Sequence, residues 1–141
     1  MTNLLSEHKK IKFEGGLRKN GHFKKSNSNR PLISIITVVM NGAQFLENTI
    51  LSVIEQNYDN IEYIVVDGGS SDKTLKIIKK YEHIIDYWIS ENDNGIYDAM
   101  NKGLNLSRGE WINFMNAGDL LINKSIVKNI FIDKRCRSKF I

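Results

Sequence analysis

The chain has 141 residues, of which 41% are hydrophobic and 26% are charged, as is typical of a single globular domain. Its one cysteine, Cys136, excludes an internal disulfide framework and fits a reducing compartment. No stretch approaches the roughly 18 apolar residues of a membrane-spanning helix, and no apolar run at the start marks a secretory signal, so we expect a cytoplasmic protein.

The positive charge is concentrated at the start of the chain. Residues 1–30 hold eight Lys/Arg and two Glu, whereas the remainder holds twelve basic and fourteen acidic side chains. This basic segment could contact an anionic membrane surface, at the inner face of the cell membrane, or could be a solvated extension, which we favour. It lacks the interleaved aromatic residues that stack on bases, so we expect no nucleic-acid partner. Its Gly, Ser and Asn content predicts disordered coil, with the folded domain over residues 31–141.

From residue 32 onward, apolar runs alternate with segments of helical periodicity. Short runs rich in Ile, Val and aromatic residues predict strands at 32–40, 62–66, 87–90 and 111–115. Apolar side chains three and four residues apart predict helices at about 45–56, after residue 71, after residue 96 and from residue 125. We expect Ser70 or Ser71 to cap the second helix and Gly109 to end the third. This order predicts a three-layer α/β/α fold with a mostly parallel, Rossmann-like sheet.

Polar side chains follow each of the predicted strands. They are Asn41, Asp67, Glu91 with Asp93, and Asn116 with Asp119. Ligands of open parallel sheets bind beyond the carboxyl ends of the strands. We therefore expect these residues to converge on one binding site.

Asp67 is the strongest candidate for a ligand-binding residue. It ends an apolar strand, and Gly68 and Gly69 after it allow the backbone to turn and to approach a ligand closely. A carboxylate at this position can accept a hydrogen bond from a uracil N–H or a ribose hydroxyl. The alternative is that Asp67 only caps the next helix. Because Asp72 and the two preceding serines suit that role, we favour the ligand.

Three further residues carry weaker local signals. Asp119 closes an Asn-Ala-Gly-Asp turn, and a divalent-metal ligand and an ordinary turn residue are equally open interpretations. Asp98 and Lys102 lie in the first turns of a predicted helix. Their spacing favours an i, i+4 ion pair on a solvated face over a nucleotide contact.

Several common kinds of site are excluded. The three histidines have no metal-ligand spacing, and none lies near Ser70 and Ser71 to complete a hydrolase triad. No G-x-G-x-x-G follows the first strand, and no Walker lysine is present. These absences argue against dinucleotide-binding and P-loop proteins.

Four blocks of the sequence resemble a known family. They are residues 34–41 (SIITVVMN), 62–74 (EYIVVDGGSSDKT), 90–103 (SENDNGIYDAMNKG) and 109–119 (GEWINFMNAGD). In this order they resemble the N-terminal half of an inverting family 2 glycosyltransferase of the GT-A fold, which binds a nucleotide-diphosphate sugar. The third block resembles bacterial members that build capsule, exopolysaccharide or lipopolysaccharide chains. The resemblance implies an enzyme that takes a sugar from such a donor, most commonly a UDP-sugar, to a glycan or lipid-linked acceptor.

The resemblance implies a nucleotide-sugar site with roles for particular residues. Base and ribose contacts would come from the matched positions Asp67, Gly68, Gly95 and Asp98. The nucleotide pocket would be lined by Thr37 and Asn41, and phosphate would be reached by Lys102.

A metal site is implied in the same way. Asp119 matches the last acid of the family's metal-binding motif, which implies Mn²⁺ or Mg²⁺ bound to the diphosphate. The chain departs from the motif at Asn116 and Gly118, where family members commonly carry acids. It also departs at Met40, where an aromatic residue is common.

The acceptor site and the general base of the family belong to its second half. Inverting transfer needs a carboxylate that deprotonates the acceptor hydroxyl, and we expect this base beyond Ile141. The chain is then a truncated, donor-binding half. The alternative is a non-catalytic nucleotide-binding or interaction module. A nucleotidyltransferase would need a basic, glycine-rich phosphate loop after the first strand, and residues 41–44 do not form one.

Overall fold

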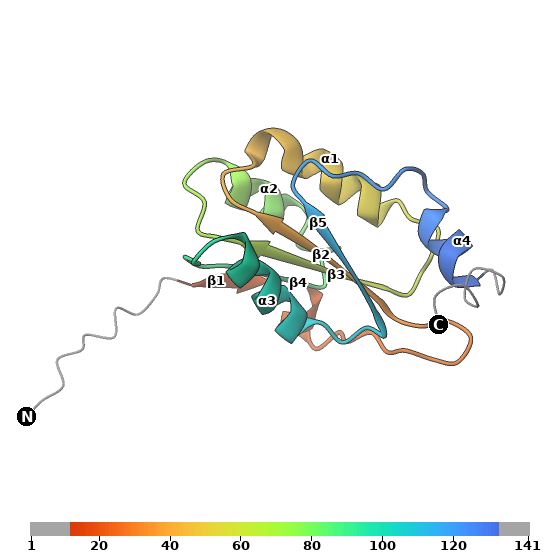
Figure 1. The fold of residues 1–141 in the computed structure, drawn as a ribbon. Helices are drawn as coiled ribbons and strands as arrows, with labels where there is room; N and C mark the ends of the chain where they lie inside the picture. Colours follow the sequence, from red (N-terminus) through yellow and green to blue (C-terminus); the bar gives the residue numbers. More distant parts are fainter. Residues whose placement is uncertain (1–11, 133–141) are drawn as a thin grey trace, which may run out of the picture.

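The computed structural model describes residues 12–132, which form a five-stranded sheet with helices packed against it (Figure 1). The strands are β1 (Phe13–Gly15), β2 (Ile33–Val39), β3 (Ile61–Asp67), β4 (Tyr87–Ser90) and β5 (Trp111–Asn116). Their spatial order is β1-β4-β3-β2-β5. All pairings are parallel except that of β1 with β4, so the mostly parallel sheet predicted from the sequence is confirmed.

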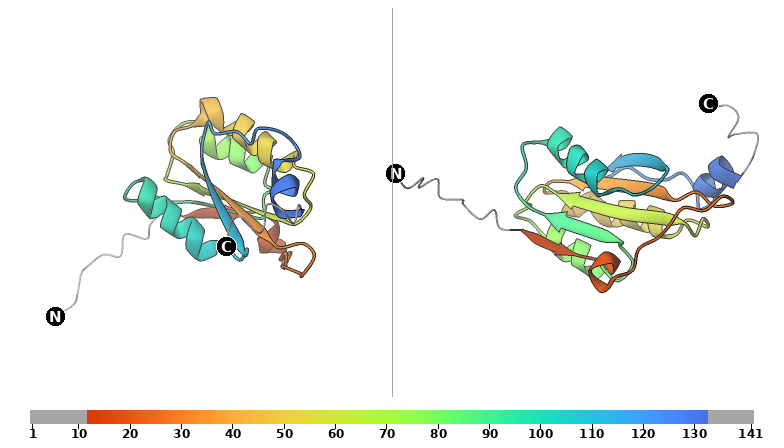
Figure 2. Two further views of the ribbon diagram at one scale, coloured as in Figure 1. Left: turned by 45° about the vertical axis from the view of Figure 1, so that its right-hand side comes forward. Right: turned by 90° about the horizontal axis from the view of Figure 1, so that it is seen from below.

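Helices cover both faces of this sheet (Figure 2). One face carries α1 (Ala43–Ile54), α2 (Thr74–Lys80) and α4 (Ile126–Ile132). The other carries α3 (Ile96–Leu106), which packs over β2 and β3. The three-layer α/β/α architecture is therefore confirmed. None of the helices in residues 12–132 is long and apolar enough to cross a bilayer.

The central strands are buried on both sides. Every residue of β2 and β3 is buried, and alternate side chains enter two separate apolar clusters. The cluster beneath α1, α2 and α4 includes Ile35 and Ile78, and the cluster beneath α3 includes Ile36, Val66 and Ala99. Two covered faces explain why these strands are almost continuous runs of Ile and Val.

The start of the described chain corrects one expectation. Residues 13–20, expected to be coil, form β1 and a short 3-10 helix, η1 (Leu17–Asn20). The Arg18 guanidinium pairs with the buried carboxylate of Glu62, and Lys24 Nζ lies 3.0 Å from Asp86 Oδ2. The polar side chains of this segment are thus used to satisfy buried acids. Residues 21–30 of the predicted extension form no helix or strand, as expected, whereas residues 1–11 and 133–141 lie outside the described residues.

Two predicted helix boundaries are also corrected. α2 begins at Thr74, whose backbone N–H donates to Asp72 Oδ1 at 2.9 Å, so neither Ser70 nor Ser71 caps it. α3 ends at Leu106, before Gly109. A side chain at Gly109 would clash with Ser34, so this glycine serves a close approach between β2 and the chain entering β5.

Candidate functional site

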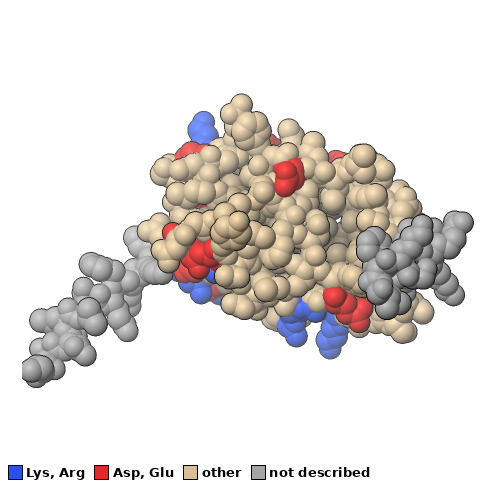
Figure 3. All heavy atoms as spheres, in the orientation of Figure 1, with Lys and Arg blue, Asp and Glu red and all other residues tan. Residues whose placement is uncertain are grey.

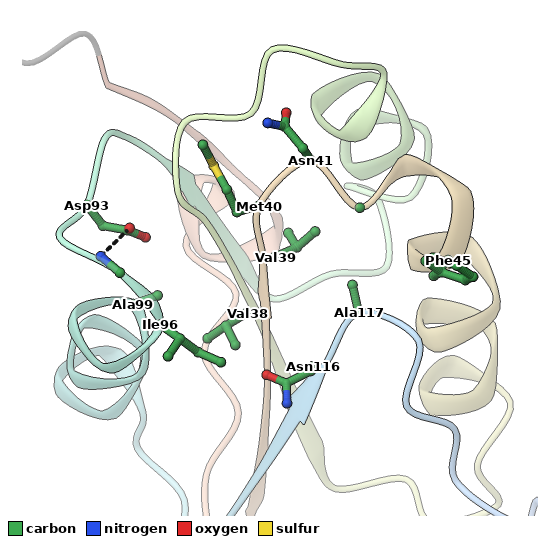
Figure 4. A pocket seen from close by; sticks show the side chains of 12 residues that line it. Val38, Val39, Met40, Asn41, Phe45, Asp93, Ile96, Ala99, Asn116 and Ala117 are labelled. Carbon is green, nitrogen blue, oxygen red and sulfur yellow. Dashed lines mark hydrogen bonds between the residues drawn. The ribbon is translucent and has the colours of Figure 1, made fainter.

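A cavity of about 380 Å³ opens at the carboxyl end of β2 (Figure 4). It lies between the end of β2, the end of β5, the first turn of α1 and the start of α3. Its polar lining residues are Asn41, Asp93 and Asn116, and the main apolar ones are Val38, Met40, Phe45, Ile96 and Ala99. The sequence predicted that polar residues following the strands meet at the carboxyl-terminal end of the sheet. This is confirmed for β2, β4 and β5.

Asp67 lies beside this cavity but not in its wall. Its carboxylate is fully buried and accepts hydrogen bonds from the Ser70 N–H, the Ser70 hydroxyl and the Ser90 hydroxyl. Both oxygens are therefore used to order the turn after β3. Ser70, which we expected to cap α2 and so to leave Asp67 for a ligand, is instead bonded to Asp67.

Asn41 links this turn to the cavity. Its backbone adopts the left-handed region, with φ 48°, and its side-chain oxygen accepts from the Ser71 N–H at 2.8 Å and the Asp72 N–H at 3.3 Å. The Asn41 N–H in turn donates to Ser70 Oγ at 2.7 Å. Asn41 thus lines the cavity while it fixes the two loops at the ends of β2 and β3.

Asp72 completes the connection between these loops and α1. Its carboxylate accepts from the backbone N–H groups of Thr74 at 2.9 Å and Ala43 at 3.1 Å. Hydrogen bonding to Thr74 holds the pKa of Asp72 below its ordinary value. Asp72 is therefore ionised at neutral pH and braces the start of both helices.

Asp93 contributes a carboxylate to the cavity, and the sequence suggested no specific role for it. Its Oδ1 accepts from the Gly95 N–H at 3.0 Å. A Cβ built on Gly68 would lie 2.7 Å from Asp93 Oδ2, so the absence of a side chain at Gly68 makes room for this carboxylate. The only sequence signal was its place after the third predicted strand.

The structure places Gly95 in the cavity wall, whereas Asp98 and Lys102 lie on the flank of α3. Lys102 Nζ lies 3.1 Å from Glu91 Oε1 and 3.7 Å from Asp98 Oδ2. Asp98 Oδ2 also accepts from the Asn94 N–H at 2.9 Å. The i, i+4 pair favoured from the sequence is confirmed, and neither side chain lines the cavity.

Thr37 is not brought to the cavity. It is fully buried within β2, and its hydroxyl lies 2.8 Å from that of Tyr63. Burial raises the pKa of the Tyr63 phenol, so this pair stays neutral inside the core. The cavity is lined instead by Val38 and Val39, which lie nearer the carboxyl end of β2.

Asp119 lies just beyond the end of β5. It is exposed, and its Oδ2 accepts from the Asn116 N–H at 2.8 Å, so it closes the turn that carries Asn116 and Ala117 into the cavity wall. Within residues 12–132, no three His, Cys, Asp or Glu side chains gather closely enough to enclose a metal. The turn at the end of β5 offers one carboxylate, Asp119, and one amide, Asn116, which suits a cation only if a ligand supplies further oxygens.

The fold resembles solved glycosyltransferases. TarS residues 1–349 of S. aureus in complex with UDP-GlcNAc superposes with a TM-score of 0.61 at 27% identity, over 70% of this chain and 29% of that one. The mannosyltransferase PcManGT of Pyrobaculum calidifontis, in complex with GDP-Man and Mn²⁺, gives a TM-score of 0.65 over 79% of this chain and 35% of that one. At 21% identity, the second likeness concerns the fold alone. The fold is thus that of the GT-A glycosyltransferases.

Sequence comparison defines the family. The family model described as "Glycosyl transferase family 2" matches residues 34–128, so the chain belongs to glycosyl transferase family 2. An uncharacterized glycosyltransferase of Rickettsia typhi is 38% identical over 115 residues, which are 82% of this chain and 36% of that protein. A PGL/p-HBAD biosynthesis glycosyltransferase of Mycobacterium bovis is 38% identical over 96 residues, 64% of this chain and 37% of that protein. The chain therefore spans little more than a third of the length of these relatives.

Proposed function

We propose that the cavity at the carboxyl ends of β2 and β5 binds the nucleotide-diphosphate sugar of a glycosyl transfer reaction. The observation that carries this proposal is the placement of Asn41, Asp93 and Asn116 around one cavity, in the part of the chain that matches the family. TarS, which shares this fold, binds UDP-GlcNAc, and this favours a UDP-sugar.

The cavity suggests how such a donor would lie. Asp93 can accept a hydrogen bond from the base or ribose, next to the apolar side chains of Met40 and Ile96. The diphosphate would then lie toward Asn116 and Asp119. A divalent ion held by Asp119 and the diphosphate oxygens would neutralise the charge of the leaving group. Asp67 and Gly68 contribute by ordering the turn against which Asp93 packs.

We further propose that the chain supplies the donor-binding part of an inverting transferase for bacterial surface polysaccharide, acting on a glycan or lipid-linked acceptor at the inner face of the membrane. A relative named as a PGL/p-HBAD biosynthesis glycosyltransferase supports a biosynthetic role for the transfer. No residue among 12–132 is assigned as the base that deprotonates the acceptor. The 141-residue chain alone is expected to bind donor and to transfer sugar poorly or not at all.

Calorimetric titration with UDP and GDP, with and without Mn²⁺, tests the donor site. We expect UDP to bind more tightly with Mn²⁺, and Asp119→Ala to remove that gain, at a cost of about tenfold or more in affinity. Asp93→Asn should weaken binding with and without the metal. Asp59→Ala, an exposed carboxylate distant from the cavity, is the control. If neither nucleotide binds to the folded chain, the donor site is refuted and a non-catalytic interaction module becomes the better explanation.

A further inference from the structure

The loop of residues 91–95 carries Asp93 from β4 to α3. Its first residue is held by the turn that follows β3, because the Glu91 N–H donates to the Asp67 carbonyl oxygen at 3.1 Å. A Cβ built on Gly69 would clash with the loop, which shows how closely the two segments pack. Beyond Glu91 the loop is largely exposed, and loops with few buried contacts open easily. Its order therefore depends on side chains that reach it from other elements.

Lys102 of α3 reaches this loop. Its Nζ lies 3.1 Å from Glu91 Oε1, 3.4 Å from the Asn92 carbonyl oxygen and 3.7 Å from Asp98 Oδ2. Asp98 Oδ2 in turn accepts from the Asn94 N–H at 2.9 Å. An ammonium group has three N–H donors, and three oxygens surround this one. The Lys102 side chain is only 21% exposed, whereas most lysine side chains lie in solvent, so these contacts hold it in place.

We infer that Lys102 is a positioning residue for the nucleotide, because it holds the loop of residues 91–95 so that Asp93 keeps its place in the cavity wall. Asp93 Oδ1 accepts from the Gly95 N–H at 3.0 Å, so the orientation of its carboxylate is set by the same loop (Figure 4). A binding group that is fixed in advance binds more tightly than one that the ligand must first order. The inference rests on the proposed donor site, in which Asp93 contacts the base or ribose.

A direct contact between Lys102 and the diphosphate fits the geometry less well. Lys102 does not line the cavity, and the proposed position of the diphosphate is toward Asn116 and Asp119, on the side of β5. An ammonium group that moved to the phosphates would leave the carboxylates of Glu91 and Asp98 without this cation. Figure 3 shows acidic side chains gathered near the start of α3, so the ammonium group balances a negative part of the surface where it lies. These contacts favour a role in holding the loop.

Titration of the 141-residue chain with uridine and with UDP separates the two roles of Lys102. If Lys102 positions Asp93, Lys102→Met should raise the dissociation constants of uridine and UDP by the same factor, about tenfold. Lys102→Arg, which can still pair with both carboxylates, should stay within about threefold of the unsubstituted chain for both. Lys76→Met removes the same charge from an exposed position of α2 and is the control, which should change neither. If Lys102→Met weakens UDP and leaves uridine unchanged, Lys102 contacts phosphate and the inference is overturned.

Amide hydrogen exchange measured by NMR tests the loop without any ligand. In Lys102→Met, the Asn94 and Gly95 N–H groups should exchange about threefold faster or more. The Gly118 N–H, which donates to Thr49 Oγ1 at 2.8 Å, should not change. Unchanged exchange at Asn94 and Gly95 would overturn the inference. If the unsubstituted chain binds neither uridine nor UDP, the donor site is refuted instead, and the exchange rates still decide whether Lys102 orders the loop.

Discussion

The carboxylate of Asp67 is fully buried, and three hydrogen bonds from Ser70 and Ser90 depend on it. We expect Asp67→Ala to lower the free energy of unfolding by about 1–3 kcal/mol, because the buried Ser90 hydroxyl and the partly buried Ser70 would lose their acceptor. Chemical denaturation measures this change. Asp93→Asn, which alters a carboxylate of the loop between β4 and α3, should cost much less. Equal losses would show that Asp67 does not hold the turn.

Single residues of the site could be predicted only in part from the sequence. The ends of the apolar runs indicated Asn41 and Asn116 as candidates, and both line the cavity. The face to which each side chain of β2 points could not be predicted, because a strand buried on both sides shows no polar alternation. Thr37 was therefore placed in the cavity, whereas it is buried against Tyr63, and Val38 and Val39 at the end of the strand line the cavity.

At the scale of the element, α3 depends on a close approach to the sheet at Gly103. A Cβ there would lie inside van der Waals contact with Ile36 of β2. Helix propensity alone favours alanine over glycine by about 1 kcal/mol, but the clash opposes it. We expect Gly103→Ala to destabilise the fold by about 1–3 kcal/mol, as overpacking of a core does. Thermal or denaturant unfolding measures the change.

A substitution at an exposed position of α3 separates the effect of helix propensity from the effect of the clash. Asn105 faces solvent, so Asn105→Ala changes propensity without a clash and should be neutral or slightly stabilising. If Gly103→Ala is also stabilising, α3 has room to move away from β2. The wall that α3 provides for the cavity would then be adjustable.

Helices and strands with a clear apolar periodicity could be predicted from the sequence, whereas β1 and η1 could not. The β2, α1 and β3 segments follow from their apolar patterns alone. β1 and η1 have no such pattern. Their segment is held by Arg18 of η1 and by Lys24, which follows η1, and these residues pair with Glu62 and Asp86 far along the chain. A polar segment that serves buried acids has the composition of a solvated extension, and its sequence alone does not distinguish the two.

For the molecule as a whole, the stability of the pairing between β1 and β4 should depend on pH. Hydrogen bonds from Tyr87 and then Lys19 lower the pKa of Glu14 to about 2, from 4.5. A carboxyl group with a lowered pKa stabilises the folded state above its ordinary pKa, and that stability is lost as the pH falls from about 4.5 toward 2. Acid should therefore weaken the contact between β1 and β4.

Glu14→Gln should remove this pH dependence. At neutral pH we expect it to lower the free energy of unfolding by about 0.5–1.5 kcal/mol, and the difference from the unmodified chain should vanish toward pH 2. Denaturation at several pH values measures both. Glu55→Gln, an exposed carboxyl at the end of α1, is the control. A difference that persists at the lowest pH would contradict this account.

Arg18 tests whether the segment before β2 belongs to the folded domain. The side chains of Arg18 and Glu62 are only 10% and 2% exposed, so Arg18→Met leaves a buried carboxylate without its cation. We expect a loss of about 3 kcal/mol or more in the free energy of unfolding. Arg30→Met breaks an exposed pair with Asp59 and should cost less than about 1 kcal/mol.

A second substitution distinguishes the buried charge from lost packing. If the uncompensated charge causes the loss, Glu62→Gln added to Arg18→Met should recover much of it, since both ions are then removed. A fragment that begins at residue 31 lacks both Arg18 and Lys24, and it should be at least as unstable as Arg18→Met. If that fragment unfolds with the stability of the whole chain, the domain begins at residue 31 after all. The contacts of β1 and η1 would then contribute nothing to the fold.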